Sequence, residues 1–160
     1  MKSSYDYVQR KEKEGRDKLS KIKLCCGRYW TFTEGLYDRY DAMLMEGGVI
    51  QAVYEIKHRD KAYDEFLLEM PKAKALSNEL KKCREVNPYC KAHYVVIVDN
   101  VIYDFDLLKL AAEKKLKIGQ LYLPSCGTCQ DHQMRDVYFL KVEYATKYKY
   151  NEDTDEYEVI

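Results

Sequence analysis

Residues 39–59 read RYDAMLMEGGVIQAVYEIKHR, which is two strand-like segments on either side of a Gly-Gly turn. Side chains alternate between the two faces of a β-strand, so Glu55 and Lys57 are expected on one face and Ile56 on the other. The stretch therefore predicts a β-hairpin whose second strand ends with a carboxylate beside an ammonium group.

The position of Asp41 relative to this pair depends on the register of the hairpin. A three-residue loop at 46–48 pairs Asp41 with Val53, and Asp41 then shares a face with Glu55 and Lys57. A two-residue Gly-Gly turn shifts the register by one residue and exchanges the faces, which places Asp38 opposite Lys57 instead. We favour the three-residue loop and keep Asp38 as the alternative. The core side of the hairpin would then carry Ile56 together with Tyr40, Ala42 and Leu44.

Two carboxylates beside a lysine suit a hard divalent cation, and Mg²⁺ commonly binds one or two carboxylates together with water and phosphate oxygens. Asp41 and Glu55 are therefore candidate ligands for Mg²⁺ or Mn²⁺. Such a metal polarises a phosphoryl oxygen and lowers the pKa of a bound water, while Lys57 can position that water or stabilise developing charge. The simpler interpretation of Glu-x-Lys is a solvated strand face with a cross-strand ion pair.

The arrangement of Asp41, a Gly-Gly turn and Glu55-Ile56-Lys57 resembles the core motif of the PD-(D/E)XK nuclease superfamily. The run from Glu55 to Leu76 resembles the pattern in many small, often phage- or mobile-element-associated members. Tyr40 stands where the motif has its proline, and the resemblance covers most of residues 29–148. It implies an α/β, restriction-endonuclease-like fold in which helices flank a central mixed β-sheet.

The resemblance also implies roles for individual residues. Asp41, Glu55 and the backbone carbonyl of Ile56 would hold the metal, and Lys57 would orient the attacking water. The supporting pair that follows the motif would be Glu69 and Lys72, with Lys72 assisting catalysis from the next helix. A glutamate on the first helix would assist the metal, and the sequence offers Glu12 and Glu14 without choosing between them.

The implied function is a Mg²⁺-dependent nuclease that hydrolyses phosphodiester bonds of nucleic acid, with DNA as the expected substrate. The alternative is a catalytically inactive module on the same fold that binds nucleic acid or protein. Six tyrosines are candidates either for stacking on bases or for ordinary packing. They are Tyr37, Tyr40, Tyr63, Tyr89, Tyr94 and Tyr103.

Length and composition predict one globular domain. The chain has 160 residues, of which 46% are hydrophobic and 13% aromatic, enough for a single core. We expect a nuclease-like domain over residues 1–150 and a flexible acidic tail over 151–160. No apolar stretch approaches the roughly 20 residues that cross a bilayer, and residues 1–15 lack a secretory apolar segment, so a cytoplasmic protein is expected.

Charge is balanced overall, with 27 basic and 27 acidic residues, which argues against a general polycation. Residues 1–28 nevertheless carry nine Lys or Arg against four Asp or Glu. A helix over about residues 4–24 is expected there. It either lies along a phosphate backbone or is a solvated helix with i,i+4 ion pairs.

The six cysteines are expected to be reduced thiols, because the core needs no disulfides. Cys126 and Cys129 form a single CxxC, either half of a zinc site or ordinary loop thiols. His58 is expected on the face opposite Lys57, and His93 as a structural histidine. The remaining elements are expected as a strand at 28–33, a helix at 64–85, a strand or hairpin at 92–105, a helix at 106–115 and a strand at 136–150.

Overall fold

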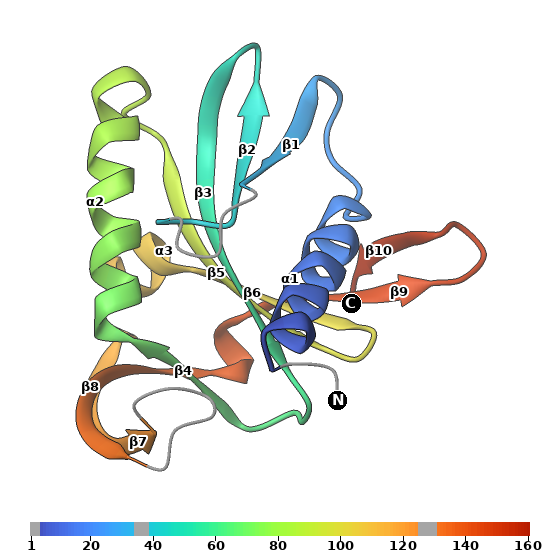
Figure 1. The fold of residues 1–160 in the computed structure, drawn as a ribbon. Coiled ribbons are helices and arrows are strands. Elements are labelled where there is room, and N and C mark those ends of the chain that lie inside the picture. Colours follow the sequence, from blue (N-terminus) through green and yellow to red (C-terminus); the bar gives the residue numbers. More distant parts are fainter. Residues whose placement is uncertain (1–3, 34–38, 125–130) are drawn as a thin grey trace.

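A seven-stranded mixed sheet forms the centre of the fold (Figure 1). The structure is a computed structural model, and it describes residues 4–33, 39–124 and 131–160. The strand order is β1-β2-β3-β5-β6-β9-β10. Strands β3 and β5 pair in parallel, and the other neighbours in this order pair antiparallel. The strands are β1 (Arg28–Phe32), β2 (Ala42–Glu46), β3 (Val49–Arg59), β5 (Lys91–Val98), β6 (Val101–Asp106), β9 (Thr146–Asn151) and β10 (Glu156–Val159).

A second, three-stranded antiparallel sheet follows from the end of β3. Its order is β4-β8-β7, with β4 at Glu65–Glu69, β8 at His132–Lys141 and β7 at Lys117–Pro124. A short 3-10 turn at Val142–Tyr144 connects β8 to β9 and so joins the two sheets. In Figure 1 this second sheet lies below the central one, beside the lower end of β3.

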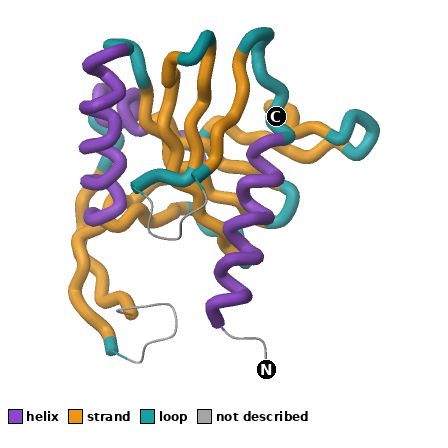
Figure 2. The backbone as a smooth tube through the Cα atoms, turned by 45° about the horizontal axis from the view of Figure 1, so that its top comes forward, coloured by secondary structure: helices purple, strands orange, loops and turns teal. Residues whose placement is uncertain are grey.

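Two long helices cover opposite faces of the central sheet. Helix α1 (Ser4–Ser20) contributes Leu19 to a core cluster that includes Val95 and Ile97 of β5. Helix α2 (Met70–Val86) packs Leu76 and Leu80 on Val53 and Ala92. The ribbon and tube views show the sheet between the two helices (Figures 1 and 2). The expected mixed α/β architecture in one domain is confirmed.

Gly15 sets how closely α1 approaches β3. A Cβ atom at this position would lie 3.1 Å from Cγ2 of Ile56 and 3.3 Å from Cδ2 of His58. A side chain here would therefore push the helix away from the strand that carries the Glu-Ile-Lys motif.

Several expected elements are confirmed. The strand at 28–33 is β1, and the segment at 92–105 is the β5–β6 hairpin, which turns at residues 99 and 100. Asp106 caps the short helix α3 (Leu107–Ala112) by accepting a hydrogen bond from the Lys109 N–H at 3.0 Å, as its position predicted. No helix among the described residues is long and apolar enough to cross a membrane.

Three expectations were wrong in their boundaries. Residues 65–69 form β4, because Phe66 and Leu68 alternate toward the core, so the helix expected from 64 begins only at Met70. The strand expected at 136–150 is β8, the 3-10 turn and β9. The expected tail contains β10, which pairs with β9 and buries Tyr157 to 2% exposure. Tyr157 also donates its backbone N–H to the Lys21 carbonyl at 2.9 Å.

Candidate active site

The β2–β3 hairpin brings Asp41 to the Glu-Ile-Lys motif by a route that neither predicted register described. The turn is the two-residue Gly47-Gly48 form, with positive φ values of 57° and 77°, and Glu46 pairs with Val49. A β-bulge between Leu44 and Met45 then shifts the register once more. The favoured three-residue loop was therefore wrong, although Asp41 still lies on the predicted face.

The core side of the hairpin is also partly as expected. Ala42 and Leu44 are buried in the cluster against which Ile56 packs. Tyr40 instead packs against the cluster on the α2 side, so its expected position was wrong. Asp38, the alternative acidic residue, lies outside the described residues.

Asp41 is held directly against the motif. Its Oδ2 accepts a hydrogen bond from the backbone N–H of Ile56 at 2.7 Å, and its own N–H donates to the Tyr54 carbonyl at 2.8 Å. One carboxylate oxygen is thereby fixed to the backbone between Glu55 and Lys57. The structure thus brings together the first acidic residue and the Glu-Ile-Lys triplet that sequence spacing had linked.

Glu55 is buried, with 6% of its surface exposed. Its Oε1 forms an ion pair with Nζ of Lys72 at 3.0 Å, and Lys72 lies in the first turn of α2, next to Pro71. Its Oε2 is buried and has no hydrogen-bond partner among the described residues. A buried carboxylate oxygen without a partner is costly, and a bound cation would satisfy it.

The electrostatics of the site follow from this burial. Desolvation, and then the neighbouring charge of Asp41, raise the pKa of Glu55 to about 7. Burial also raises the pKa of Asp41, against the opposing effect of its hydrogen bond from Ile56. Burial tends to lower the pKa of Lys72, but attraction to Glu55 raises it overall. Two carboxylates crowded in this way favour a site that takes up positive charge.

A cavity of about 240 Å³ opens onto these residues. The exposed side chain of Lys57 lines this cavity. Its positive charge tends to lower the pKa values of Asp41, Glu55 and Glu12. All four residues predicted to be catalytic line this one cavity. They are Asp41, Glu55, Lys57 and Lys72.

Helix α1 forms one wall of the cavity and settles which of its glutamates faces the site. Glu12 lines the cavity, and its pKa is raised by burial and by the charge of Asp41. Glu14 instead forms ion pairs with Lys11 at 3.4 Å and Lys18 at 3.1 Å. Glu12 is therefore the helix glutamate that can assist the site.

Arg16 also lines the cavity, although no motif in the sequence pointed to it. Its Nε and Nη2 are buried without a hydrogen-bond partner in the described part of the chain. Helical periodicity offered a signal, because Glu12 and Arg16 are four residues apart and lie on the stripe that continues to buried Gly15 and Leu19.

Glu69 does not accompany Lys72 as the resemblance implied. Its Oε2 forms an ion pair with Nη1 of Arg135 at 2.5 Å, at the junction of β4 and β8. His58 lies against Gly15 of α1, and its Nε2 is buried without a partner among the described residues. Glu69 does not line the cavity around Glu55, whereas His58 is part of the cavity wall next to α1.

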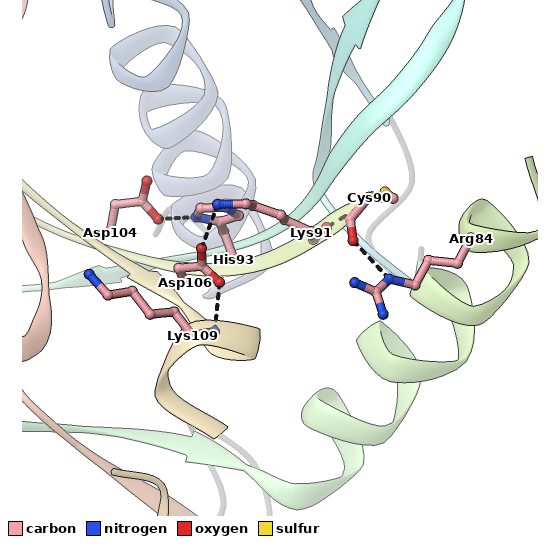
Figure 3. Close-up of polar contacts among 7 residues, drawn as sticks. All are labelled: Arg84, Cys90, Lys91, His93, Asp104, Asp106 and Lys109. Atoms are coloured by element: carbon pink, nitrogen blue, oxygen red, sulfur yellow. Dashed lines mark hydrogen bonds and ion pairs between the residues drawn. The ribbon is translucent and has the colours of Figure 1, made fainter. Parts of the chain in front are cut away.

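His93 is a structural residue, as expected. Its Nδ1 lies 2.7 Å from Oδ1 of Asp104 (Figure 3). Its ring also stacks on Tyr54, with centroids 4.7 Å apart. In the same view Lys91 pairs with Asp106 at 2.9 Å. These polar side chains of β5 and β6 thus pair with one another across the sheet.

The four described cysteines are free thiols that differ in their exposure. Cys25 and Cys26 are exposed, and Cys83 and Cys90 are buried free thiols. Cys126 and Cys129 lie outside the described residues. Across the described ranges, no three His, Cys, Asp or Glu side chains form a group placed to hold a metal ion. A metal at the Asp41–Glu55 pair would therefore need backbone, water or substrate oxygens to complete its ligands, as Mg²⁺ commonly does.

The donors at this pair fit a hard divalent cation. Asp41 keeps one oxygen that the Ile56 hydrogen bond does not use, and Glu55 presents its unpartnered Oε2. Both are carboxylate oxygens, which Mg²⁺ and Mn²⁺ prefer over nitrogen or sulfur.

Comparison with known proteins gives a fold-level similarity. No protein-family model matches the chain, and no curated protein matches it. Among solved structures, it is similar to Hjc, a Holliday junction resolvase from the archaeal hyperthermophile Archaeoglobus fulgidus. The two share 9% sequence identity with a TM-score of 0.44, over 81% of this chain and 80% of Hjc.

Proposed function

We propose that this protein is a divalent-metal-dependent nuclease that hydrolyses phosphodiester bonds of DNA. The observation that carries the proposal is the convergence of Asp41 and Glu55 in one cavity with Lys57 and Lys72. A buried carboxylate beside a second, half-buried one destabilises a fold unless the pair has a function or a counter-charge. Here one oxygen of Glu55 has only a half-exposed lysine as its partner, and the other has none among the described residues.

Asp41 and Glu55 would hold Mg²⁺ or Mn²⁺, with the Ile56 carbonyl as the further ligand implied by the resemblance. The bound cation would polarise a phosphoryl oxygen and lower the pKa of a water. Lys57 projects into the cavity from the strand position after Ile56, where it can orient that water and stabilise charge on the phosphate. Lys72 fixes Glu55 through its Oε1, so the free Oε2 keeps one orientation.

The test is a cleavage assay on single-stranded, duplex and branched DNA, run separately in Mg²⁺, Mn²⁺ and EDTA. Wild-type protein should cleave at least one substrate only with metal. Asp41→Asn, Glu55→Gln and Lys57→Ala should each lower the rate by about 10²–10³-fold or more, the usual effect of losing a group that stabilises the transition state.

Lys82→Ala is the matched control for Lys72→Ala. Lys82 lies on the same helix and also pairs with a glutamate, Glu79 at 3.4 Å, but it does not line the cavity. Lys72→Ala should reduce cleavage, and Lys82→Ala should not.

Undiminished cleavage by Asp41→Asn, Glu55→Gln or Lys57→Ala would refute the assignment. Salt-dependent DNA binding without cleavage, by protein shown to be folded, would support the inactive binding module instead.

A further inference from the structure

A larger cleft adjoins the candidate active site. It has a volume of about 690 Å³ and shares Lys57, His58 and Asp60 with the smaller cavity. Its other walls come from the end of β3, the segment that leads to β4, and strands β4, β7 and β8. A substrate held in this cleft would therefore reach Lys57 directly.

The lining of the cleft combines aromatic and basic side chains. Tyr63 is the most accessible aromatic residue there, with 57% of its surface exposed. Its ring meets Phe66 edge to face, with centroids 6.5 Å apart and an interplanar angle of 87°. In such a contact at most one face of the Tyr63 ring is covered by Phe66, so the other is left for stacking.

The charges around Tyr63 are mixed. The basic lining residues Lys57, Arg59, Lys61 and Arg135 are nearly balanced by the acidic lining residues Asp60, Glu65 and Glu69. A groove that bound nucleic acid by charge alone would need a clear basic excess. Affinity in this cleft must therefore come in large part from the aromatic contact.

We propose that this cleft binds an unpaired segment of DNA next to the bond that is cut, with a base stacked on Tyr63 and flanking phosphates near Arg59 and Lys61. The inference rests on the proposed function, because the shared Lys57 is what connects the cleft to the reaction. The volume is that of a pocket for a small ligand, which suits one or two nucleotides. Stacking on a protein ring also requires a base with an open face, as single-stranded DNA provides.

The tyrosines that the sequence left undecided are separated by their surroundings. Tyr94 is buried and donates its hydroxyl to the Leu67 carbonyl at 3.0 Å. Tyr89 is 86% exposed but lies in the turn between α2 and β5, away from the cleft. Tyr37, another of these candidates, lies outside the described residues. Among the described candidates, Tyr63 is the one placed for stacking, and Tyr89 is the matched control.

The test is fluorescence anisotropy of labelled oligothymidylate and of a blunt duplex of equal length, measured in EDTA so that no cleavage occurs. Alanine substitution of a stacking residue costs about 1–3 kcal/mol per base, so Tyr63→Ala should raise the Kd for oligothymidylate by roughly 5- to 150-fold. Tyr63→Phe should retain most of the affinity because it keeps the ring. Tyr89→Ala should leave the Kd unchanged, and the duplex Kd should respond little to either change.

Lys61→Gln provides a second measurement. Loss of one phosphate contact should reduce the slope of log K against log salt by about 0.7 for a single strand. An unchanged Kd in Tyr63→Ala, or an equal loss for duplex and single strand, would overturn the inference.

The outcome is separate from that of the proposed function. If the protein cleaves DNA with metal but binds it equally well without the Tyr63 ring, only the proposed binding role of the cleft is refuted. Tyr63-dependent binding without cleavage in any metal would refute the nuclease and keep the binding site.

Discussion

Glu55→Gln should stabilise the metal-free protein at alkaline pH while abolishing its activity. Glu55 is buried beside Asp41, and its pKa of about 7 lies above the 4.5 of an ordinary glutamate. The folded state therefore favours the neutral carboxyl. The contribution of Glu55 to stability is fully present below about pH 4.5, and it is lost as the pH rises through about 7. Above that pH, folding has to bury a charge that glutamine does not carry.

The size of the effect follows from the two pKa values. The rise in the pKa of Glu55 from 4.5 to about 7 corresponds to about 3 kcal/mol of folding free energy, at about 1.4 kcal/mol per pKa unit. Glutamine keeps an oxygen that can accept the hydrogen bond from Lys72, so little is lost in exchange. At pH 8 in EDTA the variant should therefore exceed wild type by up to about 3 kcal/mol in free energy of unfolding, and at pH 4.5 the difference should vanish.

Urea unfolding at the two pH values measures this difference. With an m-value of about 2 kcal/mol/M, the midpoint at pH 8 should rise by about 1–1.5 M urea. Mg²⁺ at about 100 times its Kd should then stabilise wild type by about 2.7 kcal/mol and leave Glu55→Gln unchanged. Glu79→Gln, which alters a glutamate paired with Lys82 near the surface, is the control. Equal stability of wild type and Glu55→Gln at pH 8 would refute the inference that Glu55 is ionised at a cost.

Two further predictions concern α1 and β10. Glu12→Gln should lower metal-dependent cleavage about tenfold or more at limiting Mg²⁺, and Glu14→Gln should not, because only Glu12 lines the cavity with Asp41. Equal cleavage rates in the two variants would contradict the placement of α1. Tyr157→Ala should lower the free energy of unfolding by about 3–5 kcal/mol in urea unfolding experiments, because the Tyr157 ring is buried in the core. A loss below about 1 kcal/mol would instead indicate that residues 151–160 are a flexible tail.

The sequence predicted the part of the site that depends on strand alternation. Glu55 and Lys57 are two residues apart on one strand, so their shared face needed no long-range information. Short strands were harder to predict. Strand β4 has five residues and runs directly into a helix, and β10 has four residues within an acidic segment. Their pairing partners, β8 and β9, supply the stability that so few residues cannot provide alone.

The choice between Glu12 and Glu14 needed a different kind of information. Both glutamates are ordinary helix residues, and the decisive fact is which side of α1 meets β3. Gly15 and Leu19 identify that side, because both are buried and Gly15 allows close contact with Ile56. A burial pattern along the helix could have revealed this. The pattern was weak because charged residues dominate α1 on both sides.

The position of Asp41 depends on two irregularities that act together. The two-residue turn alone would have moved Asp41 to the opposite face from Glu55. The bulge adds one residue to β3, where Leu44 pairs with Ala52 and Met45 with Ile50, and this second shift restores the face. It also moves Asp41 two residues farther along β3 than the three-residue loop would have done, which is about 7 Å toward Glu55. The hydrogen bond from Ile56 to Asp41 exists only in this combined register, so the bulge is as necessary to the candidate site as the acidic residues themselves.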